Sequence, residues 1–281
     1  MRKQILCLLA AAIFLCFPFT AGAERNKYLD VALSFLEEGN PFLKRYNEIN
    51  ETEITPVCPL GCPYFWGGRH VVSLLKPYSP NSSSDYYKRD QKYLYGLDCT
   101  GFIQYIQKKT GYEPQAKNAD LLKASQYTEY ARTAANKAVG TERAQALRIG
   151  DLVVMQHTSG GYHIAMYCGT LSFYGYTEET LPPELIPYLE YPLIIHCTGS
   201  SDYYLRYKAY LEDLNETEII PPYGGVIVSI LDAPQSAATA ETPDEIGLCQ
   251  PCFDLEGYHL QITDLSQEKR FRWIRWRLKA E

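Results

Sequence analysis

The sequence predicts an α+β fold in which N-terminal helices pack on an antiparallel sheet or half-barrel. Apolar residues at helical spacing dominate the chain before residue 111, whereas short β-type runs bounded by glycine and proline dominate after residue 150. Helices that come first and strands that follow are typical of α+β domains.

The chain opens with a segment that is typical of a secretory signal peptide. Two basic residues precede an apolar stretch from Ile5 to Phe19, and the small residues AGA (21–23) follow. The stretch is short for a membrane anchor, although an uncleaved anchor is the alternative. We expect cleavage of residues 1–23, export to the cell envelope or beyond it, and no stable membrane insertion afterwards.

The remaining chain divides into a main domain and an extension. Residues 24–232 are predicted to form one folded domain, a size that suits a single core. Residues 233–281 are predicted to be a linker and a C-terminal extension packed on that domain. The linker is small and acidic in composition, and the tail "KRFRWIRWR" is basic and aromatic.

The charge balance excludes one class of partner. The whole chain has a formal net charge of −6, and removing Arg2 and Lys3 with the leader makes it −8. Binding to phosphate backbones needs a basic surface, so nucleic acid is not an expected partner.

Three helical regions are predicted. Residues 26–38 carry apolar side chains at helical spacing and end at the sequence GNP (39–41). A second helix begins at Asp98 and ends near Gly111. A third, alanine-rich region at 119–138 has a weaker helical pattern.

Five later runs have the apolar and β-branched composition of strands. They are "DLVVMQ" (151–156), "YHIAMYCG" (162–169), "PLIIHCTG" (192–199), "GGVIVSIL" (224–231) and "GYHLQITDL" (257–265).

Cys99 lies where the second helix begins, and Asp98 before it is a typical N-cap. The partial positive charge of a helix N-terminus stabilises a thiolate, so we expect a lowered pKa and a nucleophilic role for Cys99. Half of a disulfide is the alternative, because exported proteins usually pair their cysteines. Seven cysteines remain after residue 23, however, so at least one is unpaired within the chain.

Two of the five histidines are predicted to meet at one edge of the sheet. His163 opens one strand and His196 closes the next, and such ends lie side by side in antiparallel neighbours. A thiol at a helix start that faces both would form a Cys-His-His version of a catalytic triad. His157 and His259 are the alternatives to His196 as the third member.

Five ordered segments resemble the NlpC-type cell-wall cysteine peptidases, which are papain-like enzymes. They are "PYFWGG" (63–68), "DCTGFIQYI" (98–106), "LRIGDLVV" (147–154), "HIAMYCG" (163–169) and "IIHCTG" (194–199). The resemblance implies a papain-like fold with the nucleophile at a helix N-terminus. It also implies hydrolysis of amide bonds in peptidoglycan stem peptides, with no metal or organic cofactor.

The resemblance also implies a role for each member of the triad. Cys99 matches the nucleophile, His163 the general base and His196 the residue that orients the imidazole. The implied scissile bond joins the side-chain carboxyl of D-glutamate to the diamino acid of the stem peptide.

Three further residues match substrate-binding positions of the family. Tyr64 matches a tyrosine that lines the site, while Asp98 and Thr100 flank the nucleophile, where Asp98 offers a charge partner for a substrate ammonium. The segments 70–95 and 170–191 are longer than is usual in the family, and we expect both to border the cleft.

Two short cysteine motifs lie far apart in the chain, a C-x₃-C and a C-x-x-C. Their members are Cys58, Cys62, Cys249 and Cys252. Two disulfides that hold the C-terminal segment on the domain are the favoured interpretation. A four-thiolate zinc site is the alternative, because paired short spacings suit tetrahedral coordination.

Two other functions fit the same motifs. The triad could serve an amidase or acyltransferase that acts on another amide. Alternatively, the protein could be a non-catalytic cell-wall-binding protein that keeps the fold without the activity.

Overall fold

The structure is a computed structural model, and it describes fourteen parts of the chain. These are residues 26–36, 48, 51, 62–69, 91–94, 96–111, 128–131, 140–157, 162–183, 185–199, 201–231, 252–255, 258–262 and 268–276. The predicted signal peptide (1–23) and linker (233–245) lie outside the described residues.

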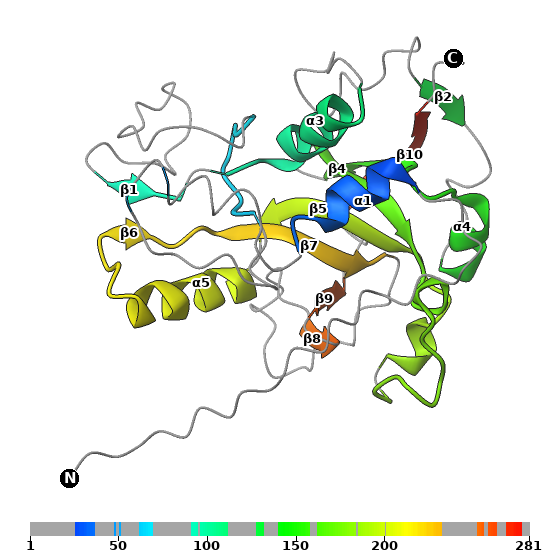
Figure 1. The fold of residues 1–281 in the computed structure, drawn as a ribbon. Helices are drawn as coiled ribbons and strands as arrows, with labels where there is room; N and C mark the ends of the chain where they lie inside the picture. Colours follow the sequence, from blue (N-terminus) through cyan, green and yellow to red (C-terminus); the bar gives the residue numbers. More distant parts are fainter. Residues whose placement is uncertain are drawn as a thin grey trace.

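An eight-stranded sheet with the order β2-β10-β3-β4-β5-β7-β9-β8 forms the centre of the fold (Figure 1). Its strands are β2 (Thr128–Ala131), β3 (Leu152–His157), β4 (Tyr162–Gly169), β5 (Leu193–Gly199), β7 (Gly224–Ile230), β8 (Cys252–Leu255), β9 (Tyr258–Ile262) and β10 (Glu268–Trp276). Neighbouring strands are antiparallel except β7 and β9, which are parallel. All five runs that the sequence analysis assigns to strands therefore contain a strand.

Helices and short elements surround this sheet. They are α1 (Lys27–Leu33), α3 (Cys99–Lys109), α4 (Thr141–Ala146), α5 (Ser201–Asp213) and the 3₁₀ helices η3 (Ser172–Tyr174) and η4 (Ile186–Tyr188). The strands β1 (Lys92–Tyr93) and β6 (Ile219–Ile220) pair with each other in parallel, away from the main sheet.

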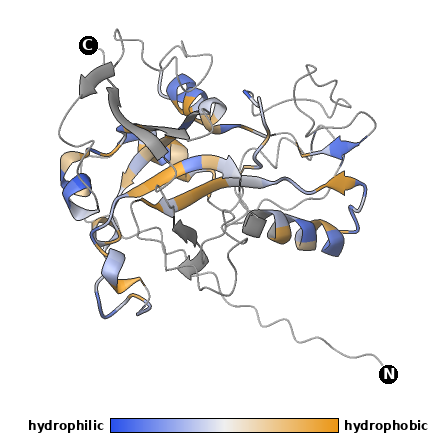
Figure 2. Cartoon of the chain, turned by 180° about the vertical axis from the view of Figure 1, so that it is seen from behind, coloured by the Kyte–Doolittle hydropathy of each residue, from blue (hydrophilic) through white to orange (hydrophobic). Residues whose placement is uncertain are grey.

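The main core lies between α1, α3 and one face of the sheet (Figure 1). Phe102, Ile103 and Ile106 of α3 are fully buried there, as the helical spacing predicts. Alternate residues of β4 and β5 face them, including Ile164 and Ile195. Figure 2 shows the apolar character of the central strands and the mixed character of the surrounding helices. Mixed helices and antiparallel strands confirm the predicted α+β class.

The segment 62–68, which carries the "PYFWGG" motif, joins the start of β7 to the start of α3. The Tyr64 N–H donates to the Gly224 carbonyl at 2.9 Å, and the Phe65 N–H donates to the Leu97 carbonyl at 2.9 Å. A further bond runs from the Leu97 N–H to the Pro63 carbonyl at 3.1 Å. The motif is therefore a structural bridge that fixes where α3 begins relative to the sheet.

Close backbone packing explains why glycine recurs around this bridge. A Cβ added at Gly101 would lie 2.0 Å from the Gly68 carbonyl oxygen, and one added at Gly68 would lie 2.2 Å from the Gly96 carbonyl oxygen. Such distances are shorter than any van der Waals contact, so only glycine lets these three stretches of backbone approach.

One local prediction is wrong, and several elements were not predicted. A helix is expected over 119–138, but residues 128–131 form β2 and pair with β10. The other α-helices and strands that are not among the predicted elements are α4, α5, β1, β6, β8 and β10. In α5 the buried residues Tyr207 and Leu211 lie four residues apart, as on one face of a helix. The helix contains four tyrosines, and their polar hydroxyl groups make its apolar face hard to recognise in the sequence.

Within the described residues, no helix is both long and apolar enough to cross a bilayer.

Replacing Gly101 with alanine should destabilise the protein by about 1–3 kcal/mol, because the new methyl group meets the Gly68 carbonyl. On an exposed helix face the same change would stabilise by roughly 1 kcal/mol. The free energy of unfolding in urea measures the effect. Lys108→Ala, at an exposed position of the same helix, is the control and should change stability by less than about 0.5 kcal/mol. A stabilised Gly101→Ala variant would contradict the packing argument.

Candidate active site

Asp98 caps α3 and connects its first turn to the motif segment. Its Oδ1 accepts a hydrogen bond from the Gly101 N–H at 2.7 Å, and its Oδ2 accepts one from the Gly67 N–H at 3.1 Å. The Arg69 guanidinium forms an ion pair with the same carboxylate. The predicted N-cap is confirmed, and Cys99 occupies the first helical position as expected.

Cys99 is half-buried at the start of α3, and its surroundings disfavour the thiolate. Burial raises the pKa of the Cys99 thiol to about 11, with a further contribution from the negative charge of Asp98. Hydrogen bonds from the Ile164 N–H and the Thr100 hydroxyl, together with the charge of Arg69, oppose this shift only in part. The predicted lowering of the Cys99 pKa is therefore wrong, because burial and the Asp98 charge outweigh the groups that favour the thiolate.

The position of Cys99 against the sheet follows from how β4 and β5 pair. Their pairing covers Met166 to Gly169 of β4, so it stops before Ile164. The Ile164 N–H makes a hydrogen bond to the Cys99 thiol. Because Ile164 directly follows His163, the thiol lies at the end of β4 that carries the predicted base.

The two predicted histidines are in contact. His163 Nε2 lies 2.6 Å from His196 Nδ1, and the rings meet edge to face with centroids 4.9 Å apart. Because Nε2 of His163 makes this contact, Nδ1 is the ring nitrogen that can accept a proton from a thiol. A direct contact between Cys99 and His163 stays a prediction.

His196 makes a second hydrogen bond that the sequence analysis does not anticipate. Its Nε2 lies 2.8 Å from the Ser229 hydroxyl on the neighbouring strand β7. His196 is only 4% exposed, and Ser229 is fully buried. Burial lowers the pKa of His196 to about 3, so the ring is neutral at physiological pH. The only feature of the sequence that could have indicated Ser229 as a partner is its hydroxyl group, the single one in the otherwise apolar run "GGVIVSIL".

The other predicted site residues lie around Cys99. Thr100 is buried, with its hydroxyl 3.9 Å from the Cys99 sulfur. Tyr64 is half-buried and packs against the main core, as Cys99 does. The alternatives to His196 contribute no described side chain: only the backbone of His157 and His259 is described, at the end of β3 and in β9.

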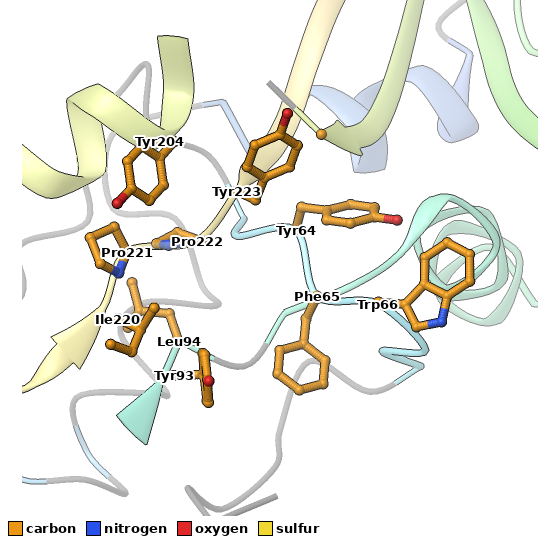
Figure 3. A pocket seen from close by; sticks show the side chains of 11 residues that line it. Tyr64, Phe65, Trp66, Tyr93, Leu94, Tyr204, Ile220, Pro221, Pro222 and Tyr223 are labelled. Atoms are coloured by element: carbon orange, nitrogen blue, oxygen red, sulfur yellow. The ribbon is translucent and has the colours of Figure 1, made fainter. Parts of the chain in front are cut away.

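A pocket of about 380 Å³ adjoins Tyr64 (Figure 3). Four tyrosines and two prolines contribute to its wall, and no charged residue does. The lining residues are Tyr64, Phe65, Trp66, Tyr93, Leu94, Gly199, Tyr204, Ile220, Pro221, Pro222 and Tyr223. Such an apolar wall with hydroxyl groups suits an uncharged part of a ligand.

The structure corrects one cysteine prediction. Cys62 is a free and fully buried thiol at the start of the motif segment, so the expected disulfide at this residue is contradicted. Cys168 and Cys197 are also free and buried. Cys58 and Cys249 lie outside the described residues, and only the backbone of Cys252 is described, in β8. Among the described side chains, no group of three or more His, Cys, Asp or Glu is arranged to hold a metal ion.

The comparison with known families agrees with this geometry. Residues 61–180 match the family model of the NlpC/P60 family, and this range includes the motif segment, Cys99 and His163. His196 and Ser229 lie beyond the matched range and join the site through their hydrogen bonds. No curated protein and no solved structure matches the chain.

Over residues 61–180, the match confirms the resemblance to NlpC-type peptidases. Members of this family are typically cysteine peptidases, and the family acts on peptidoglycan. A half-buried cysteine at a helix start and a contacting pair of histidines are compatible with that class.

The raised pKa predicts that alkylation of Cys99 by iodoacetamide is slow at neutral pH and accelerates about tenfold per pH unit toward pH 11. Replacing Asp98 with asparagine removes a negative charge beside the thiol and should shift the profile to lower pH. Peptide mass mapping of the labelled full chain measures the rate. Glu218→Gln, which removes a distant exposed carboxylate, is the matched control. Fast alkylation that does not vary below pH 7 would indicate a preformed thiolate instead.

Burial of neutral His196 should make stability depend on pH. In the unfolded chain this histidine takes up a proton near pH 6.5, whereas the folded protein resists protonation down to about pH 3. Its contribution is therefore complete above pH 6.5 and is lost as pH falls through this window, by up to about 1.4 kcal/mol per pH unit. Urea unfolding at pH 7.5, 6 and 5 should show a shallower loss for His196→Asn than for wild type. Equal losses of stability in wild type and His196→Asn would contradict the assignment of His196 as a buried neutral residue.

Proposed function

We propose that the protein is a secreted cysteine peptidase that hydrolyses amide bonds in peptidoglycan stem peptides. The observation that carries the proposal is the combination of Cys99 at the start of α3 with the contacting pair His163 and His196. The match of residues 61–180 to the NlpC/P60 family supports the choice of substrate class. The leader-like residues 1–23 support export.

In the proposed mechanism His163 acts as a general base on a neutral thiol. Because the Cys99 pKa is raised, the proton must leave the sulfur as the bond to the substrate carbonyl carbon forms. His163 Nδ1 accepts that proton, while Nε2 remains in contact with His196. In this mechanism the backbone N–H of Cys99, at the start of α3, stabilises the oxyanion of the tetrahedral intermediate.

The reaction is completed by three further proton transfers through His163. Collapse of the intermediate breaks the carbon–nitrogen bond, and His163 protonates the leaving amine while the acyl group stays on sulfur as a thioester. His163 then removes a proton from water as water attacks the thioester. The carboxylic acid leaves, and the proton returns to the thiolate of Cys99.

Substrate recognition in this proposal uses both sides of the nucleophile. Asp98 and Thr100 flank Cys99, and a substrate ammonium would approach the Asp98 carboxylate beside the Arg69 guanidinium. An uncharged part of the stem peptide or its attached sugar would lie in the aromatic pocket next to Tyr64. We propose cleavage at the bond between D-glutamate and the diamino acid.

The test is hydrolysis of purified muropeptides by the chain without residues 1–23, followed by liquid chromatography and mass spectrometry. Wild type should release stem-peptide fragments, and Cys99→Ala and His163→Ala should each lower the rate by about 1,000-fold or more. Cys168→Ala, which removes another buried thiol, should leave the rate within about twofold of wild type.

Two results would overturn the proposal. Hydrolysis of other amides or acyl donors without activity on muropeptides would indicate an amidase or acyltransferase. Binding to purified sacculi without release of fragments, and equal for wild type and Cys99→Ala, would indicate a non-catalytic wall-binding protein.

A further inference from the structure

Three side chains on adjacent strands form a continuous hydrogen-bonded chain. His163 of β4 contacts His196 of β5 at 2.6 Å, and His196 contacts Ser229 of β7 at 2.8 Å. Both ring nitrogens of His196 are engaged, and neither His196 nor Ser229 has appreciable contact with solvent. The donor and acceptor roles in this chain are therefore linked from one end to the other.

A neutral His196 carries one ring proton, so only two arrangements of the chain are possible. In the first, the proton is on Nε2 and is donated to Ser229 Oγ, so that Nδ1 accepts a hydrogen bond from His163 Nε2–H. In the second, the proton is on Nδ1 and is donated to His163 Nε2, so that Ser229 donates its hydroxyl proton to His196 Nε2.

The two arrangements differ in what they leave on His163. In the first, a neutral His163 has its proton on Nε2, and Nδ1 carries the lone pair that can remove a proton. In the second, Nε2 is an acceptor, the single proton of His163 is on Nδ1, and the ring cannot act as a base there. The general-base role in the proposed function thus requires the first arrangement.

We propose that Ser229 is a positioning residue of the site: by accepting the His196 Nε2–H it sets the tautomer of His196 and, through it, that of His163. This inference rests on the proposed function of His163 as the base. It adds a fourth member to the predicted Cys-His-His constellation, one that acts at a distance from the substrate.

The sheet fixes the position of the hydroxyl. Strands β5 and β7 pair without interruption from Leu193↔Ile230 to Gly199↔Gly224, so the offset between His196 and Ser229 is set by seven consecutive residue pairs. Val228, the neighbour of Ser229, belongs to the core cluster that includes α1 and α3. Because strand residues alternate in direction, Ser229 projects to the other face of β7, on which His196 also lies.

Kinetics on muropeptides give the first test. Ser229→Ala should lower kcat by about 10- to 100-fold with KM within about twofold, because substrate contacts are retained while the base is mispositioned. Ser229→Thr keeps the hydroxyl and should recover most of kcat. Val228→Ala is the matched control: it removes buried atoms from the adjacent residue and should lower stability while leaving kcat within about twofold.

Nuclear magnetic resonance of the full chain labelled with ¹⁵N-histidine gives a second test that needs no substrate. Long-range ¹H–¹⁵N correlations at pH 7.5 should place the proton of His196 on Nε2 and that of His163 on Nε2 in the wild type. In Ser229→Ala a population with both protons on Nδ1 should appear, and Ser229→Thr should suppress it.

The two tests separate this inference from the proposed function. A wild-type His196 with its proton on Nδ1, or tautomers that do not change in Ser229→Ala, would overturn the role of Ser229 whatever the substrate is. The expected tautomers without hydrolysis of muropeptides would instead contradict the proposed function alone. If Ser229→Ala does not fold, the wild-type tautomers and the kinetics of Ser229→Thr still test the role of Ser229.

Discussion

The Asp98 carboxylate joins two parts of the chain on which the candidate site depends, the first turn of α3 and the segment 62–69. It caps α3 through the Gly101 N–H, accepts a hydrogen bond from the Gly67 N–H and pairs with Arg69. This arrangement places the first turn of α3 against the motif segment, which is itself hydrogen-bonded to the start of β7 through Tyr64. Burial raises the Cys99 pKa, and the same negative charge, one residue from the nucleophile, adds to this shift. The anchoring of the helix therefore has a chemical consequence, since the capping charge disfavours the thiolate of Cys99.

Because the Cys99 thiol is protonated, catalysis in the proposed mechanism depends on how the two histidines are placed. A neutral thiol needs a base that is positioned to take its proton as the sulfur attacks, whereas a preformed thiolate has already lost that proton. Burial keeps His196 neutral, and its two hydrogen bonds connect His163 to the interior of the sheet. A buried polar chain of this kind is stable only when every member is satisfied. We attribute the orientation of His163 to this chain.

Much of the fold could be predicted because its signals are local. Asp98 and the apolar spacing after it mark the start of α3, and glycine or proline bounds the five runs that contain strands. Local patterns failed at residues 128–131, where alanine-rich sequence forms a strand. Its partner β10 lies about 140 residues further along the chain, so pairing across the sheet overrides the helical propensity. The cysteine spacing and the expected export predict a disulfide at Cys62, but the folded chain buries this residue as a free thiol.

The sequence by itself determined the helix that begins at Cys99 with its cap, the five runs that contain strands, and the pairing of His163 with His196, because these follow from periodicity, capping and antiparallel strand order. Only the tertiary structure decided the direction of the Cys99 pKa shift and the partner of His196. Both depend on which distant segments exclude water from a side chain, and Ser229 reaches His196 only through the β5–β7 register. Desolvation and strand register are properties of the assembled sheet, so they cannot be predicted from any local sequence pattern.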